Sequence, residues 1–166
     1  MVETTDYTQY SRKVLVPYVP TPEVVIDRML QLANAGSEDI VYDLGCGDGR
    51  IVFQAVTKYG VKKAVGIEIR DDLVKVARSK ISELNMDGKA YILHGDMFDV
   101  DLSEATIVTL FLLTSVNNML RPKLERELRN GSRVVSHEFE IPGWVPSKVD
   151  VCSDGYLKHK VYLYRR

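Results

Sequence analysis

The chain has 166 residues, a formal net charge of −1 and a sequence pI of about 6.3. This length fits a single domain, and 45% hydrophobic with 27% charged residues is an ordinary globular composition. The chain has no apolar run of the ~18 residues that a membrane-spanning helix needs, and its polar, acidic beginning is unlike a signal peptide. Two cysteines, Cys46 and Cys152, are too few for a disulfide framework or a zinc site. We therefore expect one cytoplasmic domain over residues 1–166, with no metal.

The first clear helical pattern begins at Thr21, after a segment, residues 1–16, that has no period. Thr21 is a favourable N-cap residue, and Pro22 suits the first helical position. Apolar residues then recur at helical spacing up to Gly36. These signals predict a helix that is capped by Thr21 and ends before Gly36.

Short apolar runs alternate with helical patterns along the rest of the chain. We expect strands at 40–44, 64–68, 90–94, 107–112 and 133–136, and helices at 51–59, 72–84 and about 118–128. This alternation predicts an α/β domain with a parallel sheet. Near the end, residues 149–152 and 157–164 flank Asp154-Gly155 with no helical period, so we expect an antiparallel hairpin that closes the sheet edge.

A glycine-rich loop follows the first predicted strand. Gly45 and Gly47 lie between this strand and a helix, where glycine permits a tight turn and a close approach of a ligand to the backbone. Three successive predicted strands also end in or beside an acid, namely Asp43, Glu68 and Asp96. Because the carboxyl ends of parallel strands meet at one edge of a sheet, we expect these acids to belong to one site.

The loop favours a cationic ligand over a dinucleotide. The dinucleotide fingerprint G-x-G-x-x-G requires its third glycine where this chain has Arg50, since the third glycine comes one residue early at Gly49. A pyrophosphate also avoids carboxylates, yet Asp43 and Asp48 bracket the loop. Like charges about 4 Å apart cost about 4 kcal/mol at an effective dielectric constant of 20. S-adenosylmethionine carries a sulfonium, an ammonium and a ribose, for which carboxylates are favourable partners.

The motifs YDLGCGDGR, GIE and GDMF resemble the cofactor motifs of the class I, seven-strand S-adenosylmethionine-dependent methyltransferases. This resemblance implies a Rossmann-like fold, with a mostly parallel seven-stranded sheet, helices on both faces and a C-terminal antiparallel hairpin. It also implies a set of cofactor-binding residues: Asp43, Gly45 and Gly47 beside the methionine part, Glu68 at the ribose, Ile69 on the adenine, and Asp96 with Met97 at the adenine edge and face.

A narrower resemblance covers nearly the whole chain. The segments PYVPT, TLFLLTSVNNMLRPKLEREL and RVVSHEFEIPGW are similar to the small archaeal protein-lysine methyltransferases, which are related to mitochondrial and histone-lysine methyltransferases. The resemblance implies that residues 1–20 fold over the cofactor, that Thr21 reaches its carboxylate and that Tyr18 forms a wall of the acceptor channel. Too little chain remains for a recognition domain, so we expect broad choice among protein lysines, DNA-binding and chromatin proteins included. We also expect a monomer that binds neither membranes nor nucleic acid directly.

The end of the fourth predicted strand indicates the kind of acceptor. Family members that methylate bases or amides usually have Asn or Asp followed by two prolines and an aromatic residue there, whereas this chain has Leu110-Phe111-Leu112-Leu113. An apolar slot suits an aliphatic amine. Deprotonating a lysine of pKa about 10.4 at pH 7 costs about 4.6 kcal/mol, and desolvation or a nearby sulfonium lowers that pKa. We therefore expect Phe111 and Tyr18 to position a lysine for in-line transfer, with no strong general base.

Three other interpretations stay open. The chain is alternatively an RNA or small-molecule amine methyltransferase, or a module that binds S-adenosylmethionine without transfer, and a dinucleotide enzyme is the weakest alternative. His137 has no identifiable partner and is expected to be structural, and His159 belongs to no constellation. Phe139 and Trp144 are placed near the mouth of the site, where packing under a loop is the more common role.

Overall fold

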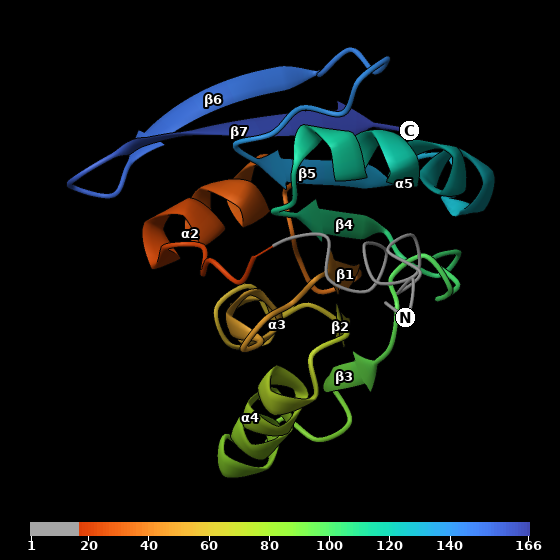
Figure 1. Cartoon of the computed structure of the whole chain (residues 1–166). Helices are drawn as coiled ribbons and strands as arrows, with labels where there is room; N and C mark the ends of the chain where they lie inside the picture. Colours follow the sequence, from red (N-terminus) through yellow and green to blue (C-terminus); the bar gives the residue numbers. More distant parts are fainter. Residues whose placement is uncertain (1–16) are drawn as a thin grey trace, which may run out of the picture.

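Within the part of the chain that the structure describes, seven strands form one sheet in the order β3-β2-β1-β4-β5-β7-β6 (Figure 1). The computed structural model describes residues 17–166. The strands are β1 Ile40–Leu44, β2 Lys63–Glu68, β3 Ala90–His94, β4 Ile107–Leu110, β5 Arg133–His137, β6 Lys148–Ser153 and β7 Lys158–Arg165. The helices are α2 Glu23–Leu32, α3 Arg50–Thr57, α4 Asp71–Glu83 and α5 Thr114–Glu127.

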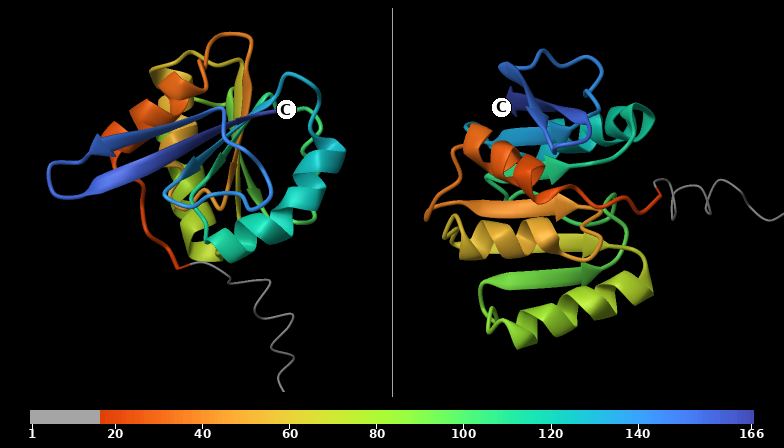
Figure 2. Two further views of the ribbon diagram at one scale, coloured as in Figure 1. Left: turned by 90° about the horizontal axis from the view of Figure 1, so that it is seen from above. Right: turned by 90° about the vertical axis from the view of Figure 1, so that its left-hand side faces the viewer.

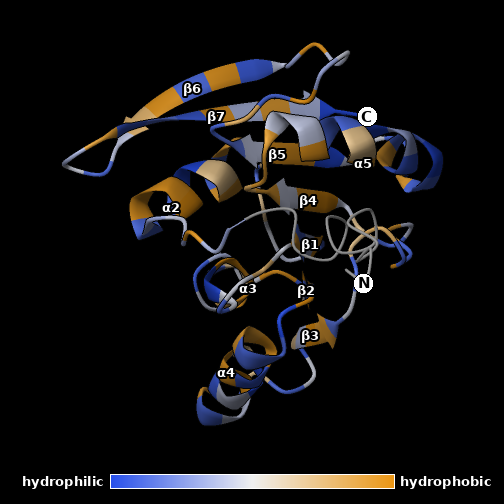
Figure 3. Ribbon diagram, in the orientation of Figure 1, coloured by the Kyte–Doolittle hydropathy of each residue, from blue (hydrophilic) through white to orange (hydrophobic). Residues whose placement is uncertain are grey.

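Strands β1 to β5 are parallel, and β7 is antiparallel to both β5 and β6. The predicted parallel sheet and terminal hairpin are therefore confirmed. The last strand, β7, lies between β5 and β6, which leaves β6 at the edge. Hydrophilic and hydrophobic residues alternate over the first four residues of β6 (Figure 3), but Val149 and Val151 are about half exposed, whereas Cys152 is buried.

Helices cover both faces of the sheet, as predicted, but unevenly. Helices α2, α3 and α4 lie along one face, and α5 covers the other (Figures 1 and 2). Because successive strand side chains point to opposite faces, Val41 of β1 belongs to the core under α2, α3 and α4, whereas Tyr42 belongs to the core under α5. Among residues 17–166, no helix combines the length and apolar character that crossing a membrane requires.

Both ends of α2 differ from the prediction. The helix begins at Glu23, and the carbonyl of Pro22 accepts the first helical amide bonds, so Thr21 is not its cap. The helix stops at Leu32 because Asn34 adopts a left-handed conformation with φ 53°. The amide of Ala35 then bonds back to the carbonyl of Leu30. This Schellman motif ends the helix before the predicted stop at Gly36.

The region between β4 and α5 also differs from the prediction. Strand β4 ends at Leu110 and α5 begins at Thr114, so the apolar stretch 111–113 is a connection and not the end of a strand. Leu112 is nevertheless buried, and Phe111 is partly buried. The apolar run thus reflects the burial of a loop beside the site described next.

Candidate active site

A cleft opens at the carboxyl ends of β1, β2 and β4 and has an empty volume of about 890 Å³, its solvent-filled mouth included. The strand order reverses here, since the chain runs outward from β1 to β3 and returns to β4 beside β1. Ligands of open α/β sheets bind at such a switch point. All of the predicted site residues line the cleft: Tyr18, Thr21, Asp43, Gly45, Gly47, Glu68, Ile69, Asp96, Met97 and Phe111.

Asp43 is the most deeply buried acid of the cleft, with 3% of its surface exposed. It lies next to Thr109 in the register of β1 and β4, and the Thr109 hydroxyl donates a 2.8 Å hydrogen bond to Asp43 Oδ1. Burial raises the pKa of Asp43 to about 7, outweighing the Thr109 bond, and repulsion from Glu68 and Asp48 adds to the rise. A cation in the cleft would relieve this electrostatic stress. Thr109 was missed in the sequence because its role depends on strand register.

Glu68, at the end of β2, holds the glycine loop in place. Its Oε1 accepts the amide of Gly47 at 2.8 Å, and its Oε2 accepts the amides of Ile69 at 2.8 Å and Arg70 at 3.0 Å. A carboxylate has about four lone-pair sites. These three backbone bonds therefore fix the orientation of Glu68 and leave it able to accept a further hydrogen bond from a ligand.

Asp48 is compensated within the protein. Arg50 donates to Asp48 Oδ1 at 3.1 Å and to Oδ2 at 2.8 Å. Burial acts to raise the pKa of Asp48, but the Arg50 guanidinium outweighs it and the pKa is lowered. The same guanidinium reaches the backbone carbonyl of Thr21 at 3.4 Å. Of the two acids that bracket the glycine loop, Asp43 is thus the one that lacks a cationic partner among the described residues.

The segment before α2 lies against the glycine loop. A Cβ atom on Gly47 would lie 2.6 Å from Cε2 of Tyr18, and Gly47 has φ +57°. Glycine is therefore required here both for the backbone conformation and for the approach of the Tyr18 ring. Of residues 1–20, which are predicted to fold over the cofactor, residues 1–16 lie outside the described residues.

Cys46 lies beneath the loop, where it packs against the backbone of β2. It is 5% exposed, and a Cβ atom on Gly66 would meet its sulfur at 2.6 Å. Burial, together with the charges of Asp43 and Glu68, raises the pKa of this thiol well above its ordinary value. Cys46 is thus a neutral packing group, in agreement with the sequence interpretation.

His137 has partners that the sequence did not reveal. Its ring lies over Phe111, with centroids 3.9 Å apart and an interplanar angle of 31°. Its Nδ1 is 3.2 Å from the Thr21 hydroxyl, and its Nε2 is 2.8 Å from Nδ1 of His159. The prediction that His137 is without a partner, and that His159 belongs to no constellation, is wrong. Strand β7 beside β5 brings the two rings together.

The two aromatic residues predicted near the mouth are placed differently. Phe139 stacks on Phe111, with centroids 6.3 Å apart, and so supports a residue of the cleft wall. Trp144 packs against Tyr164 at 5.7 Å and donates a hydrogen bond to Glu125 on α5. It belongs to the core under α5 and does not line the cleft.

Residues 43–148 match the family model of the ANTKMT methyltransferase domain. The chain belongs to this methyltransferase family. A protein-lysine N-methyltransferase of Saccharolobus islandicus is 58% identical to this methyltransferase over 90% of this chain and 92% of that protein. The adenine nucleotide translocase lysine N-methyltransferase of Mus musculus is 36% identical over 81% of this chain and 58% of its own length. The present chain thus spans less than two thirds of that mouse relative.

Solved structures agree with the fold. A crystal structure described as an RNA methyltransferase from Salinibacter ruber in complex with S-adenosyl-L-homocysteine has a TM-score of 0.83 and 46% identity, over 89% of this methyltransferase and 93% of that chain. The M1A22 tRNA methyltransferase of B. subtilis has a TM-score of 0.73 at 12% identity and therefore supports the fold alone. The predicted class I methyltransferase fold is confirmed.

Proposed function

We propose that this methyltransferase transfers the methyl group of S-adenosylmethionine to lysine ε-amines of proteins, with broad choice among basic proteins. The Saccharolobus islandicus relative, which matches over nearly its full length, is a protein-lysine N-methyltransferase. The observation that carries the proposal is the combination, in one cleft, of the buried carboxylate of Asp43 with the apolar wall made by Phe111 and Leu112. The carboxylate suits a cationic methyl donor, and the apolar wall suits the alkyl stem of a lysine.

The residues of the cleft fit S-adenosylmethionine, which supplies an electrophilic methyl group on a sulfonium when bound. The raised pKa of Asp43 reflects burial and the neighbouring acids, and a cation next to it would restore its charge. We place Asp43, Gly45 and Gly47 beside the methionine part. Glu68 is placed at the ribose because its carboxylate is already fixed by the backbone. The adenine is assigned to Ile69, Asp96 and Met97, which line the cleft next to Glu68.

The acceptor amine must be neutral before it can attack. Deprotonation of a free lysine at pH 7 costs about 4.6 kcal/mol, and an apolar environment reduces this cost because it destabilises the ammonium form. Phe111, supported by the rings of His137 and Phe139, is a rigid wall for such an environment. Tyr18, whose ring lies against Gly47, is assigned to the opposite wall. These aromatic side chains position the lysine stem.

RNA is the second candidate acceptor. The Salinibacter ruber structure, 46% identical to this chain, is described as an RNA methyltransferase. Incubation with methyl-labelled S-adenosylmethionine and three separate pools, namely basic DNA-binding proteins, total RNA and small amines, distinguishes the candidates. We expect label on lysines of several proteins, and no label with Asp43→Asn as the matched control. Label confined to RNA or to small amines would refute the protein-lysine assignment.

A further inference from the structure

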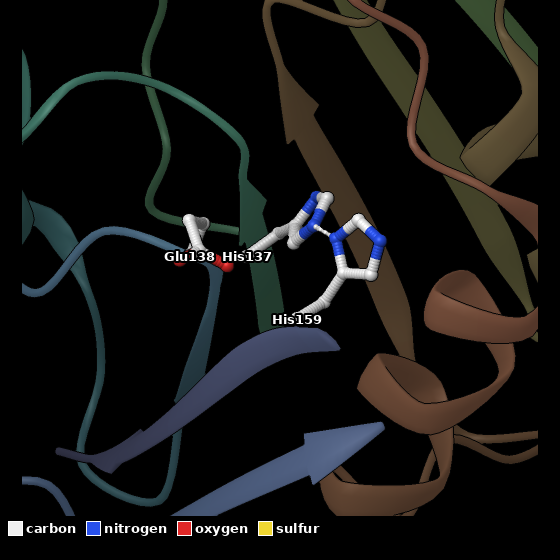
Figure 4. Close-up of side chains that lie close together, drawn as sticks. All are labelled: His137, Glu138 and His159. Carbon is white, nitrogen blue, oxygen red and sulfur yellow. Dashed lines mark hydrogen bonds between the residues drawn. The ribbon is translucent and has the colours of Figure 1, made fainter. Parts of the chain in front are cut away.

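Four side chains form a continuous hydrogen-bonded chain from the cleft to the hairpin. The Thr21 hydroxyl is 3.2 Å from Nδ1 of His137, Nε2 of His137 is 2.8 Å from Nδ1 of His159, and Nε2 of His159 is 2.7 Å from Oδ2 of Asp154. Figure 4 shows the facing nitrogens of the two rings. Thr21 lines the cleft, whereas Asp154 lies in the turn between β6 and β7. This series of hydrogen bonds therefore connects the cleft to the turn of the hairpin.

The donors and acceptors of this chain have one consistent direction when both rings are neutral. Bonds from the amides of Leu157 and Tyr156 and from His159 hold the pKa of Asp154 at about 2, so its carboxylate only accepts. Nε2 of His159 must then carry a proton, which leaves its Nδ1 as an acceptor. His137 therefore donates from Nε2 and accepts at Nδ1. The Thr21 hydroxyl donates its proton to His137 and presents only lone pairs to the cleft. In this state it cannot also donate to the carboxylate of the cofactor, the role that the resemblance implies for Thr21.

The backbone holds His137 in this position. The amide of Phe139 donates to the carbonyl of His137 at 2.9 Å, and Glu138 between them has φ 69°, which forms a γ-turn with a positive φ. Such a conformation is strained for a non-glycine residue. The amide of Glu138 also bonds to the carbonyl of Lys160 at 2.7 Å, which ties the turn to β7 next to His159. The strained turn thus aligns the two imidazoles.

We propose that Thr21, His137, His159 and Asp154 form a proton-exit chain that accepts the proton of the substrate lysine before methyl transfer. This inference rests on the proposed function, in which lysine is the acceptor. The ammonium proton passes to Thr21 Oγ1 as the hydroxyl proton passes to Nδ1 of His137. Nε2 of His137 gives its proton to Nδ1 of His159. The resulting imidazolium is paired with Asp154 until solvent takes the proton. The lysine amine is left neutral, and only N–H and O–H bonds change.

The low basicity of His137 suits a relay. Burial, with a smaller effect from His159, lowers the pKa of His137 to about 4, so this ring passes a proton on and does not store it. In the proposed chain the transferred proton is held on His159 instead, because Nε2 of His159 already faces the carboxylate of Asp154. This arrangement separates the buried transfer step at Thr21 from the charged step near solvent.

The same cluster is better explained by hydrogen bonds than by a metal ion. Each of three residues offers one possible metal-ligand atom, and these atoms of His137, Glu138 and His159 all lie within 4.8 Å of one another. The carboxylate of Glu138, however, accepts the amide of Lys160 at 3.1 Å. The two facing nitrogens are 2.8 Å apart, a distance at which one of them donates to the other. A proton therefore lies where a metal ion would have to bind.

The elements that carry the two rings, and β6 and α2 that pack against them, contribute other charged groups. Glu138 follows β5, Lys158 and Lys160 flank His159 on β7, and on β6 Asp150 pairs with Arg28 of α2 at 2.6 Å. The pair between Arg28 and Asp150 is internally neutral. Asp154 remains the carboxylate that contacts His159 directly.

The test is kcat against pH for His159→Leu, with a lysine-containing protein as substrate. We expect kcat near pH 7 to fall about 100-fold, within the range of proton-transfer catalysis. The difference should shrink as pH rises, because the substrate lysine then loses its proton in solution. Binding of S-adenosylmethionine should stay within twofold. Asp154→Asn should lower kcat about tenfold, whereas Asp150→Asn, the matched control on β6, should leave it within twofold.

Nitrogen-15 NMR of the ligand-free wild-type protein provides a readout that does not depend on folding of a variant. We expect both His137 and His159 to carry their proton on Nε2. A proton on Nδ1 of His137, or one equivalent of Zn²⁺ bound by the wild type and lost in His159→Leu, overturns the proposal. If the wild type labels lysine and His159→Leu matches it at pH 7, the proton-exit chain alone is wrong. If the wild type labels no lysine, the proposed function is wrong as well.

Discussion

Binding of S-adenosylmethionine should weaken about tenfold when the pH is lowered from 8 to 6. Asp43 is expected to contact the cation in its charged form, and its pKa in the ligand-free protein is about 7. At pH 6 about one molecule in eleven carries the charged carboxylate, and at pH 8 about ten in eleven do, which gives the factor of ten. Isothermal titration calorimetry at several pH values measures this dependence directly.

Asp43→Asn is the control for this prediction. It should bind S-adenosylmethionine weakly and without the pH dependence, because the amide does not titrate. The raised pKa also means that the folded protein binds more protons than the unfolded chain between about pH 4 and 7, so stability falls as pH rises through this window. Asp43→Asn should therefore stabilise the ligand-free protein at pH 8, by at most about 4 kcal/mol. A Kd that is equal at pH 6 and pH 8 would refute the assignment of Asp43.

Three further substitutions test the cleft. Gly47→Ala places a Cβ 2.6 Å from the Tyr18 ring at a positive φ, and calorimetry should show about tenfold weaker binding of S-adenosylmethionine. Glu68→Ala removes the acceptor of three backbone amides and should lower the free energy of unfolding by about 2 kcal/mol in urea titrations. Phe111→Ala should lower kcat about tenfold, because the lysine stem loses its wall, while the Kd of S-adenosylmethionine stays within twofold; unchanged kcat would exclude Phe111 from the channel.

Much of the fold was predictable because buried strands are short apolar runs bounded by turn residues. The bounds of β1 and β3 agree with the prediction residue for residue. The end of β4 was not predictable from hydrophobicity, since Phe111 and Leu112 face the cleft and the core from a loop. The end of α2 depends on the left-handed conformation of Asn34, a signal weaker in sequence than the glycine two residues later.

The composition of the cleft was predictable because acids at the ends of parallel strands necessarily meet at one edge. Hydrogen bonds between side chains on different strands were not predictable from the sequence. Thr109 meets Asp43 only in the register of β1 with β4. His137 and His159 meet because β7 lies between β5 and β6, an order that local periodicity does not encode. The sequence motifs therefore predicted residues that line the cleft, whereas tertiary pairing brings the two histidines together.

The two buried cysteines provide reporters of local motion at two separate places, beneath the glycine loop and on β6 of the hairpin. Cys46 lies under the glycine loop, and Cys152 lies on β6 opposite His159. Burial raises the pKa of both thiols, so neither reacts with an alkylating reagent until its surroundings open. Alkylation of Cys46 then measures how often the loop lifts, and alkylation of Cys152 measures how often the hairpin separates. A ligand that occupies the cleft protects the first thiol and leaves the second to report on the hairpin alone.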